Sequence, residues 1–141
     1  MDFQKILVPV IGSSADEDAI KLACRLAKKA KAKVYAVHVI TLKPALPVDA
    51  EVEPEIQKGE TILGSMEIAA EEEGYTVETE LLQARDAGTA ILDEAVDRDI
   101  DLILIGLPYK MPFGRFSMGQ VGPYLLKNAR CRVLMLRENP E

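Results

Sequence analysis

Apolar positions along the chain follow two periods. Short aliphatic runs at residues 5–10, 34–40, 102–105 and 132–136 are typical of strands, and residues 76–84 alternate as a fifth strand would. Between these runs, apolar residues recur at helical spacing. The predicted helices follow the turn at residues 12–14 and then cover about 55–73, 86–98 and 119–129. The order is therefore β-α-β-α-β-α-β-α-β.

Local signals mark several helix ends. Ser14 and Glu17 have the spacing of a Ser-x-x-Glu capping box at the start of the first helix. Gly59 and Gly64 weaken the second helix, because glycine disfavours a helix interior. Asp86 is expected to cap the third helix.

The alternating order predicts one α/β domain over residues 1–141. We expect a five-stranded parallel sheet between two helical layers, a three-layer α/β/α, doubly wound and Rossmann-like fold. Residues 102–105 are apolar on both faces, as in a central parallel strand. Ligands of such sheets bind beyond the carboxyl ends of the strands. Residues 10–13, 39–42, 84–87 and those from Gly106 onward are therefore the candidates for a site.

Charge and composition limit the classes of ligand and the cellular location that we expect. The net charge of −6 argues against a nucleic-acid partner, whereas residues 106–137 hold six basic and no acidic side chains and favour an anion there. No segment approaches the roughly 20 apolar residues of a membrane span, and the first residues lack a signal sequence. We therefore expect a cytoplasmic protein that is not embedded in a membrane.

The few cysteine and histidine residues argue against metal binding. Cys24 and Cys131 fall in apolar runs, and the single His38 lies in a predicted strand. These three residues do not have the spacing of metal ligands, and a single histidine here forms no Ser-His-Asp or Cys-His catalytic arrangement. We expect no structural metal and no enzymatic activity.

The segment after the fourth predicted strand is rich in glycine. Gly106, Gly114, Gly119 and Gly122 let backbone N–H groups approach an anion. A helix then begins at about Gly119, and its free N–H groups favour phosphate. An ordinary strand-to-helix connection with turn glycines would look similar.

Several motifs together resemble the universal stress protein family over essentially the whole chain. They are the opening Lys-Ile-Leu-Val-Pro-Val, the Val-His-Val-Ile strand end, Asp-Leu-Ile-Leu-Ile-Gly at residues 101–106, and the ungapped close over residues 119–137. The resemblance implies the five-stranded parallel sheet and a homodimer in which the last strands pair. That strand lies here between Arg132 and Leu136.

The resemblance also implies an adenine nucleotide (ATP, ADP or AMP, with or without Mg) as ligand. ATP-binding members carry Gly-x2-Gly-x9-Gly followed by Ser or Thr, and an Asp after the first strand. This chain keeps Gly106 and Gly119 at that spacing but has Tyr109, Gln120 and Ile11 at the other three positions. The expected nucleotide contacts are Pro9, Val10, Ile11, Val39, Gly106, Tyr109, Lys110, Arg115, Gly119, Gln120, Val121 and Gly122.

Two functions remain open at this point. One is a homodimeric, nucleotide-binding regulatory module of the stress response, which acts on an unknown protein partner. The other is an interaction protein on the same fold that binds no ligand, because Ile11, Tyr109 and Gln120 have replaced the usual contacts. Tyr109 is expected either to stack on a base or to fill the empty pocket.

Overall fold

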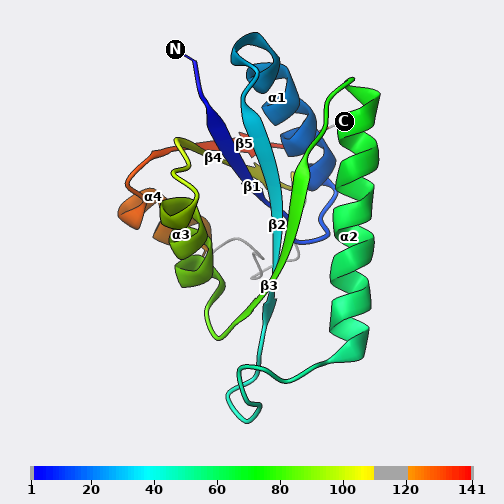
Figure 1. The fold of residues 1–141 in the computed structure, drawn as a ribbon, viewed down its shortest axis with the longest axis vertical. Helices are drawn as coiled ribbons and strands as arrows, with labels where there is room; N and C mark the ends of the chain where they lie inside the picture. Colours follow the sequence, from blue (N-terminus) through cyan, green and yellow to red (C-terminus); the bar gives the residue numbers. More distant parts are fainter. Residues whose placement is uncertain (1, 110–120, 141) are drawn as a thin grey trace.

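The computed structural model describes residues 2–109 and 121–140 (Figure 1). Helices and strands alternate along the chain, as the sequence predicts. In order they are β1 (Lys5–Pro9), α1 (Ala15–Ala30), β2 (Lys33–Thr41), α2 (Glu53–Glu72), β3 (Glu78–Ala84), α3 (Ala87–Asp97), β4 (Leu102–Leu107), α4 (Val121–Asn128) and β5 (Arg132–Arg137).

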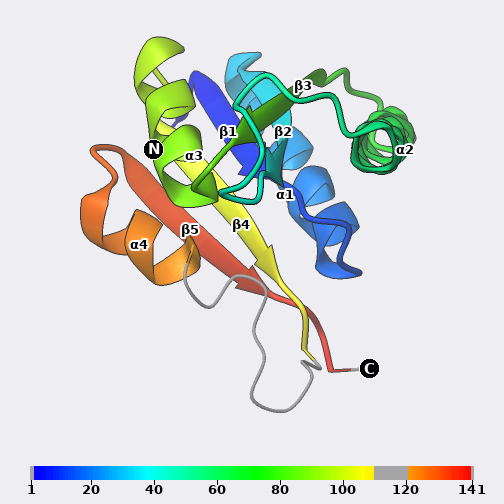
Figure 2. The same cartoon turned by 90° about the horizontal axis from the view of Figure 1, so that it is seen from below.

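The strands form one parallel sheet in the order β3-β2-β1-β4-β5. The order reverses at β1, because the chain runs outward from β1 to β3 on one side and from β4 to β5 on the other. Such a switch point opens a crevice at the carboxyl ends of the central strands. Helices α1 and α2 cover one face of the sheet, and α3 and α4 cover the other (Figure 2). The predicted fold class is confirmed.

Alternation along β1 explains how both faces become apolar. Ile6 and Val8 pack with α1 and α2, whereas Leu7 packs with α3 and α4, and all three are fully buried. In β4, residues 102–105 are buried on both faces, as predicted for a central strand. This double burial fixes β1 and β4 in the middle of the sheet, and the end of β1 borders the candidate site.

The predicted capping box at α1 is wrong. Ser14 precedes the helix but makes no side-chain capping bond. Asp16 instead anchors the loop before the helix, because its Oδ2 accepts hydrogen bonds from the backbone N–H groups of Ile11, Gly12 and Ser13 at 3.1, 2.7 and 3.1 Å. The carboxylate thus closes the β1–α1 loop, where Gly12 has a φ of +91°.

The ends of α2 and α3 follow the predictions closely. Asp86 caps α3, and its carboxylate accepts from the Thr89 N–H at 2.9 Å. Helix α2 begins two residues earlier than predicted, at Glu53, with Pro54 in its first turn, and strand β3 begins two residues later, at Glu78. Proline suits the first helical turn, because its missing N–H would have no partner there.

None of the helices in residues 2–109 and 121–140 is long and apolar enough to cross a bilayer.

Candidate functional site

A small cavity lies at the carboxyl ends of β1 and β2, beside the start of α3. Its volume is about 170 Å³. The described residues that line it are almost all aliphatic: Pro9, Val10, Ile11, Val37, Val39, Thr41, Ala87, Ile91 and Val121. No charged side chain is among them, so this part of the site suits a flat apolar group.

Two periodicities place these side chains together. Val37, Val39 and Thr41 are two residues apart on β2, so they share one face of the strand. Ala87 and Ile91 are four residues apart on α3 and therefore share one face of the helix. Val121 is the first residue of α4 and closes the cavity from the side of β4 and β5.

The β1–α1 loop brings Ile11 to the cavity, and Asp16 holds that loop. Asp16 is only 2% exposed, and besides the three N–H donors its Oδ1 accepts from the Ser13 hydroxyl at 3.3 Å. Burial raises the pKa of Asp16, and the hydrogen bonds from Gly12, Ile11 and Ser13 partly offset that rise. The chain's own carboxylate therefore occupies the anion-binding concavity that these N–H groups form.

Gly106 is an internal residue of β4 and does not line the cavity. A Cβ at this position would lie 2.4 Å from the backbone oxygen of Ala15, so glycine lets β4 pass close to the start of α1. Gly122 is buried in α4 against Met135, whose methyl group would lie 2.5 Å from an added Cβ. Both glycines thus have packing roles, and their predicted contacts with phosphate stay predictions.

Tyr109 lies with the C-terminal segment and is not among the residues that line the cavity. Its backbone N–H donates to the Glu138 carboxylate at 3.1 Å, and the Arg137 guanidinium lies 5.2 Å from the centre of its ring. Tyr109 as a whole is 42% exposed. In this arrangement Tyr109 neither fills the aliphatic cavity nor stacks over it.

The other predicted contacts from the glycine-rich loop are Lys110, Arg115, Gly119 and Gln120. They lie outside the described residues.

His38 supports the site from the opposite face of the sheet. Its Nδ1 donates to the backbone oxygen of Val10 at 2.8 Å. Gly59 of α2 makes room for the imidazole, because a Cβ there would lie 3.0 Å from His38 Cδ2 and 2.6 Å from Leu81. Within residues 2–109 and 121–140, no three His, Cys, Asp or Glu side chains are placed to hold a metal ion.

Five of the predicted contacts therefore come together at the cavity: Pro9, Val10, Ile11, Val39 and Val121. Thr41 and Ala87 fall within the candidate ranges 39–42 and 84–87, although neither was named as a contact. Sequence reasoning missed Val37 and Ile91. Val37 could have been found because it lies two residues from Val39 on the same strand, and Ile91 because it shares a helix face with Ala87.

Comparison with known proteins agrees with this architecture. The model of the universal stress protein family matches residues 2–137. Universal stress protein MJ0531 of Methanocaldococcus jannaschii is 32% identical over 142 residues, which cover 96% of this chain and 83% of that protein.

Two solved structures share the fold. The universal stress protein of Archaeoglobus fulgidus in complex with dAMP has a TM-score of 0.76 at 22% identity, covering 96% of this chain and 98% of that one. A family member from Arabidopsis thaliana with AMP bound has a TM-score of 0.67 at 16% identity, covering 97% and 93%. By its sequence match and its sheet order, the chain belongs to the universal stress protein family.

Proposed function

We propose that this protein binds an adenine nucleotide and that the base occupies the aliphatic cavity at the ends of β1 and β2. The observation that carries the proposal is the convergence of Pro9, Val10, Ile11, Val39 and Val121 on one cavity. The family resemblance implies each of them as a nucleotide contact, although they come from β1, the loop after it, β2 and α4. A flat base would bury its faces against these side chains and release water.

The β1–α1 loop limits where the phosphates can lie. Its three converging N–H groups already hold the Asp16 carboxylate, and Ile11 presents no hydrogen-bond acceptor to a ribose. We therefore propose a ligand with little concentrated charge, such as AMP, in preference to Mg-ATP. The relatives with dAMP and with AMP bound support a mononucleotide in this fold.

The direct test of this function has two steps. The purified protein is denatured and its supernatant is analysed by mass spectrometry for AMP, ADP and ATP. Protein freed of ligand is then titrated calorimetrically with AMP, Mg-ATP and cyclic di-AMP. We expect saturable binding with AMP tighter than Mg-ATP, and binding of none of the three at millimolar concentration would refute the proposal.

Filling the cavity is expected to abolish binding without unfolding the protein. Ala87 is half-buried on the cavity wall at the first position of α3, where leucine is also a good helix former. In Ala87→Leu the added side chain would occupy space that the base needs. We expect the Kd for AMP to rise at least about tenfold, which corresponds to about 1.4 kcal/mol, measured by calorimetry.

Ala90→Leu is the matched control for that variant. Ala90 lies on the same helix, is also half-buried and borders a different surface depression, next to Leu82 and Arg85. The same change in helix propensity and apolarity should leave the Kd for AMP within about twofold. Equal losses in both variants would show that the base does not lie in the cavity.

A second function, regulation without a ligand, is favoured by the size of the cavity. Its 170 Å³ is below the 300–1,000 Å³ or so of typical small-molecule sites. On this alternative the aliphatic wall is simply packing at the strand ends. The titrations above distinguish the two functions.

We also propose that the protein is a homodimer through β5. This strand forms one edge of the sheet, and the side chains of residues 133–136 are only half-buried. An apolar edge strand favours pairing with a second copy. Light scattering at micromolar concentration should give twice the mass of one chain, and a monomer would contradict the proposal.

A matched pair of variants locates that interface. Leu134→Asp introduces a charge into β5, whereas Leu126→Asp places the same charge on α4, where the side chain is already 55% exposed. We expect the first to dissociate the dimer and the second to leave it intact. Circular dichroism of both variants verifies that the fold is retained.

A further inference from the structure

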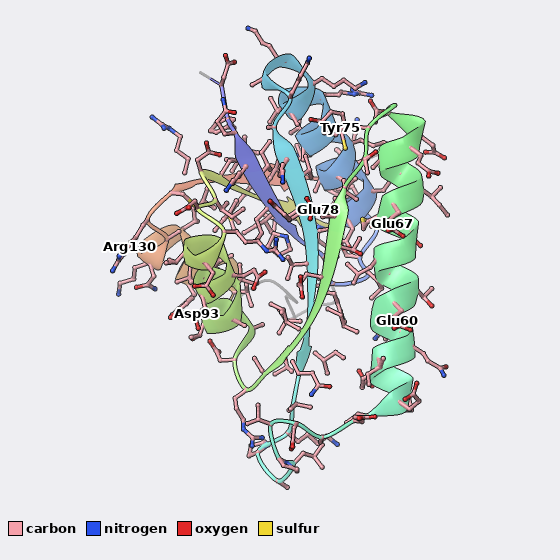
Figure 3. The ribbon with its side chains drawn as sticks, viewed as in Figure 1. Glu60, Glu67, Tyr75, Glu78, Asp93 and Arg130 are labelled. Atoms are coloured by element: carbon pink, nitrogen blue, oxygen red, sulfur yellow. The ribbon has the colours of Figure 1, made fainter. Side chains whose placement is uncertain are left out.

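A second and larger depression lies at the end of the molecule opposite the nucleotide cavity. It is a groove of about 600 Å³ between the end of α3 and the connection from α4 to β5. Figure 3 shows Asp93 on α3 and Arg130 beyond α4 on this side of the molecule. The lining residues are Leu92, Asp93, Ala95, Val96, Asp97, Asp99, Ile100, Asn128, Ala129, Arg130 and Cys131.

The rim of this groove is acidic. Asp93, Asp97 and Asp99 are exposed, and none of them takes part in the ion pairs found among the described residues. Arg130 is the one basic residue among the described residues of the lining. Three carboxylates against one guanidinium leave a net negative charge at the groove.

The helix backbone adds to this negative potential. Helices α3 and α4 both end at the groove, and a helix C-terminus carries a partial negative charge. The last turn of α3 has no basic residue and contains Asp97, so the carboxylate lies at the electrostatically unfavourable end of its helix. A cation from outside would relieve this repulsion.

The floor of the groove is apolar. Ala95 and Ile100 are buried there, and Leu92 and Ala129 are half-buried. Val96 lines the groove with 58% of its surface exposed, although a valine gains free energy when it is covered. A matching ligand therefore combines positive charge with an apolar side chain.

We propose that this groove docks a basic segment of a partner protein, with one apolar side chain against Val96 and Ile100 and Lys or Arg side chains beside Asp93 and Asp97. The recognition mode is that of a short peptide in a groove, with charge setting orientation and the apolar contact adding affinity. The groove and the nucleotide cavity have no lining residue in common. The proposal is therefore independent of nucleotide binding.

The test uses the 141-residue chain and three synthetic 12-residue peptides. The first has a central leucine flanked by arginines, the second has glutamates in place of the arginines, and the third has serine in place of the leucine. Binding is followed by calorimetry and by NMR shifts of the protein amides. We expect saturable binding of the first peptide only, with the largest shifts around residues 92–100 and 128–131.

Two double variants separate the groove from general charge attraction. Asp93→Asn/Asp97→Asn removes two carboxylates from the rim, and we expect the Kd of the arginine peptide to rise about tenfold at low salt. Glu60→Gln/Glu67→Gln removes the same charge from α2, where both residues are exposed (labelled in Figure 3). This control should leave the Kd within about twofold.

The outcomes decide the proposal. Removal of Asp97 should leave the thermal midpoint unchanged or slightly raised, because an acid at a helix C-terminus is unfavourable. Loss of binding in a stable variant then supports docking at the groove. Equal losses in both double variants, equal binding of the serine peptide, or no saturable binding at millimolar peptide would overturn it. So would self-association that depends on Asp93 and Asp97, because a second copy would then be the occupant.

Discussion

Replacing Gly106 with alanine is expected to destabilise the protein by about 3 kcal/mol, near the upper end of the cost of overpacking a core. The added Cβ would lie 2.4 Å from the Ala15 oxygen and 3.0 Å from the Ala15 carbonyl carbon. Both are backbone atoms, so no side-chain rotation can relieve the clash. Helix α1 must move away from β4 at its first residue, and chemical denaturation measures the cost.

Gly64→Ala is the matched control, and its effect should have the opposite sign. Gly64 lies inside α2, and outside its own stretch of helix no atom of the described residues comes within 4 Å of an added Cβ. Alanine there should stabilise the protein by about 0.5–1 kcal/mol, because it restricts the unfolded chain and favours the helix. A neutral Gly106→Ala variant would show that β4 does not need the close approach to α1.

Replacing Asp16 with alanine is expected to lower the free energy of unfolding by about 3–4 kcal/mol. Each buried donor that loses its acceptor costs about 1–3 kcal/mol, and partial relaxation of the loop keeps the total below the sum for three donors. The variant would leave the N–H groups of Ile11, Gly12 and Ser13 without their shared acceptor. Since Ile11 lines the cavity, the Kd for AMP should rise as well. Urea denaturation and calorimetry measure the two effects.

Asp16→Asn keeps a hydrogen-bond acceptor at this position and removes the negative charge. The amide oxygen can accept the same three hydrogen bonds, and the amide nitrogen can donate to Ser13 Oγ, so most of the stability should remain at pH 7. Burial raises the pKa of Asp16 in the folded state, so folding favours the protonated form. The contribution of this group to stability is therefore greatest below its unfolded pKa and declines as the pH rises through the folded pKa.

The pH dependence of the variant's stability follows from the upward shift of the Asp16 pKa. The asparagine variant cannot titrate at this position, so its stability relative to wild type should be greatest at neutral pH. It should fall as the pH drops through the raised folded pKa toward about 4, and it should level off at lower pH. Denaturation midpoints between pH 3 and 7 measure the trend. If the asparagine variant instead gained stability relative to wild type on acidification, burial would not be the factor that raises the pKa of Asp16.

The fold could be predicted from the sequence because its elements have distinct periods. Runs such as residues 102–105 are too short and too apolar for anything except buried strands, and helical spacing separates them. Alternating strands and helices permit few arrangements other than a covered parallel sheet. The boundaries differ by one or two residues, since terminal turns respond to tertiary contacts.

The candidate site could be predicted only in its strand-end part. Val10 and Val39 follow from the rule that ligands lie beyond the carboxyl ends of parallel strands, Pro9 follows from the family resemblance, and the structure brings the three together. The interpretation of Gly106 and Tyr109 followed motif positions, which do not reveal that Ala15 approaches one and Arg137 the other. Contacts between residues so far apart in sequence depend on the assembled fold.

Asp16 shows why local capping rules were insufficient. Ser14 and Glu17 match the capping-box pattern, but Ser14 adopts a helical conformation with ψ of −21° and cannot act as a cap. The positive φ of Gly12 turns three successive N–H groups toward a single point. Asp16, the second residue of α1, places its carboxylate at that point.

The aliphatic wall of the cavity has a thermodynamic consequence. Its only polar side chain among the described residues is that of Thr41, and none of those residues is ionisable. Burial of a base there should give a negative heat-capacity change, whereas ionic strength acts mainly on the charges of the phosphate. Adenosine and AMP should therefore share the same temperature dependence of the binding enthalpy, and salt should change the affinity of AMP alone.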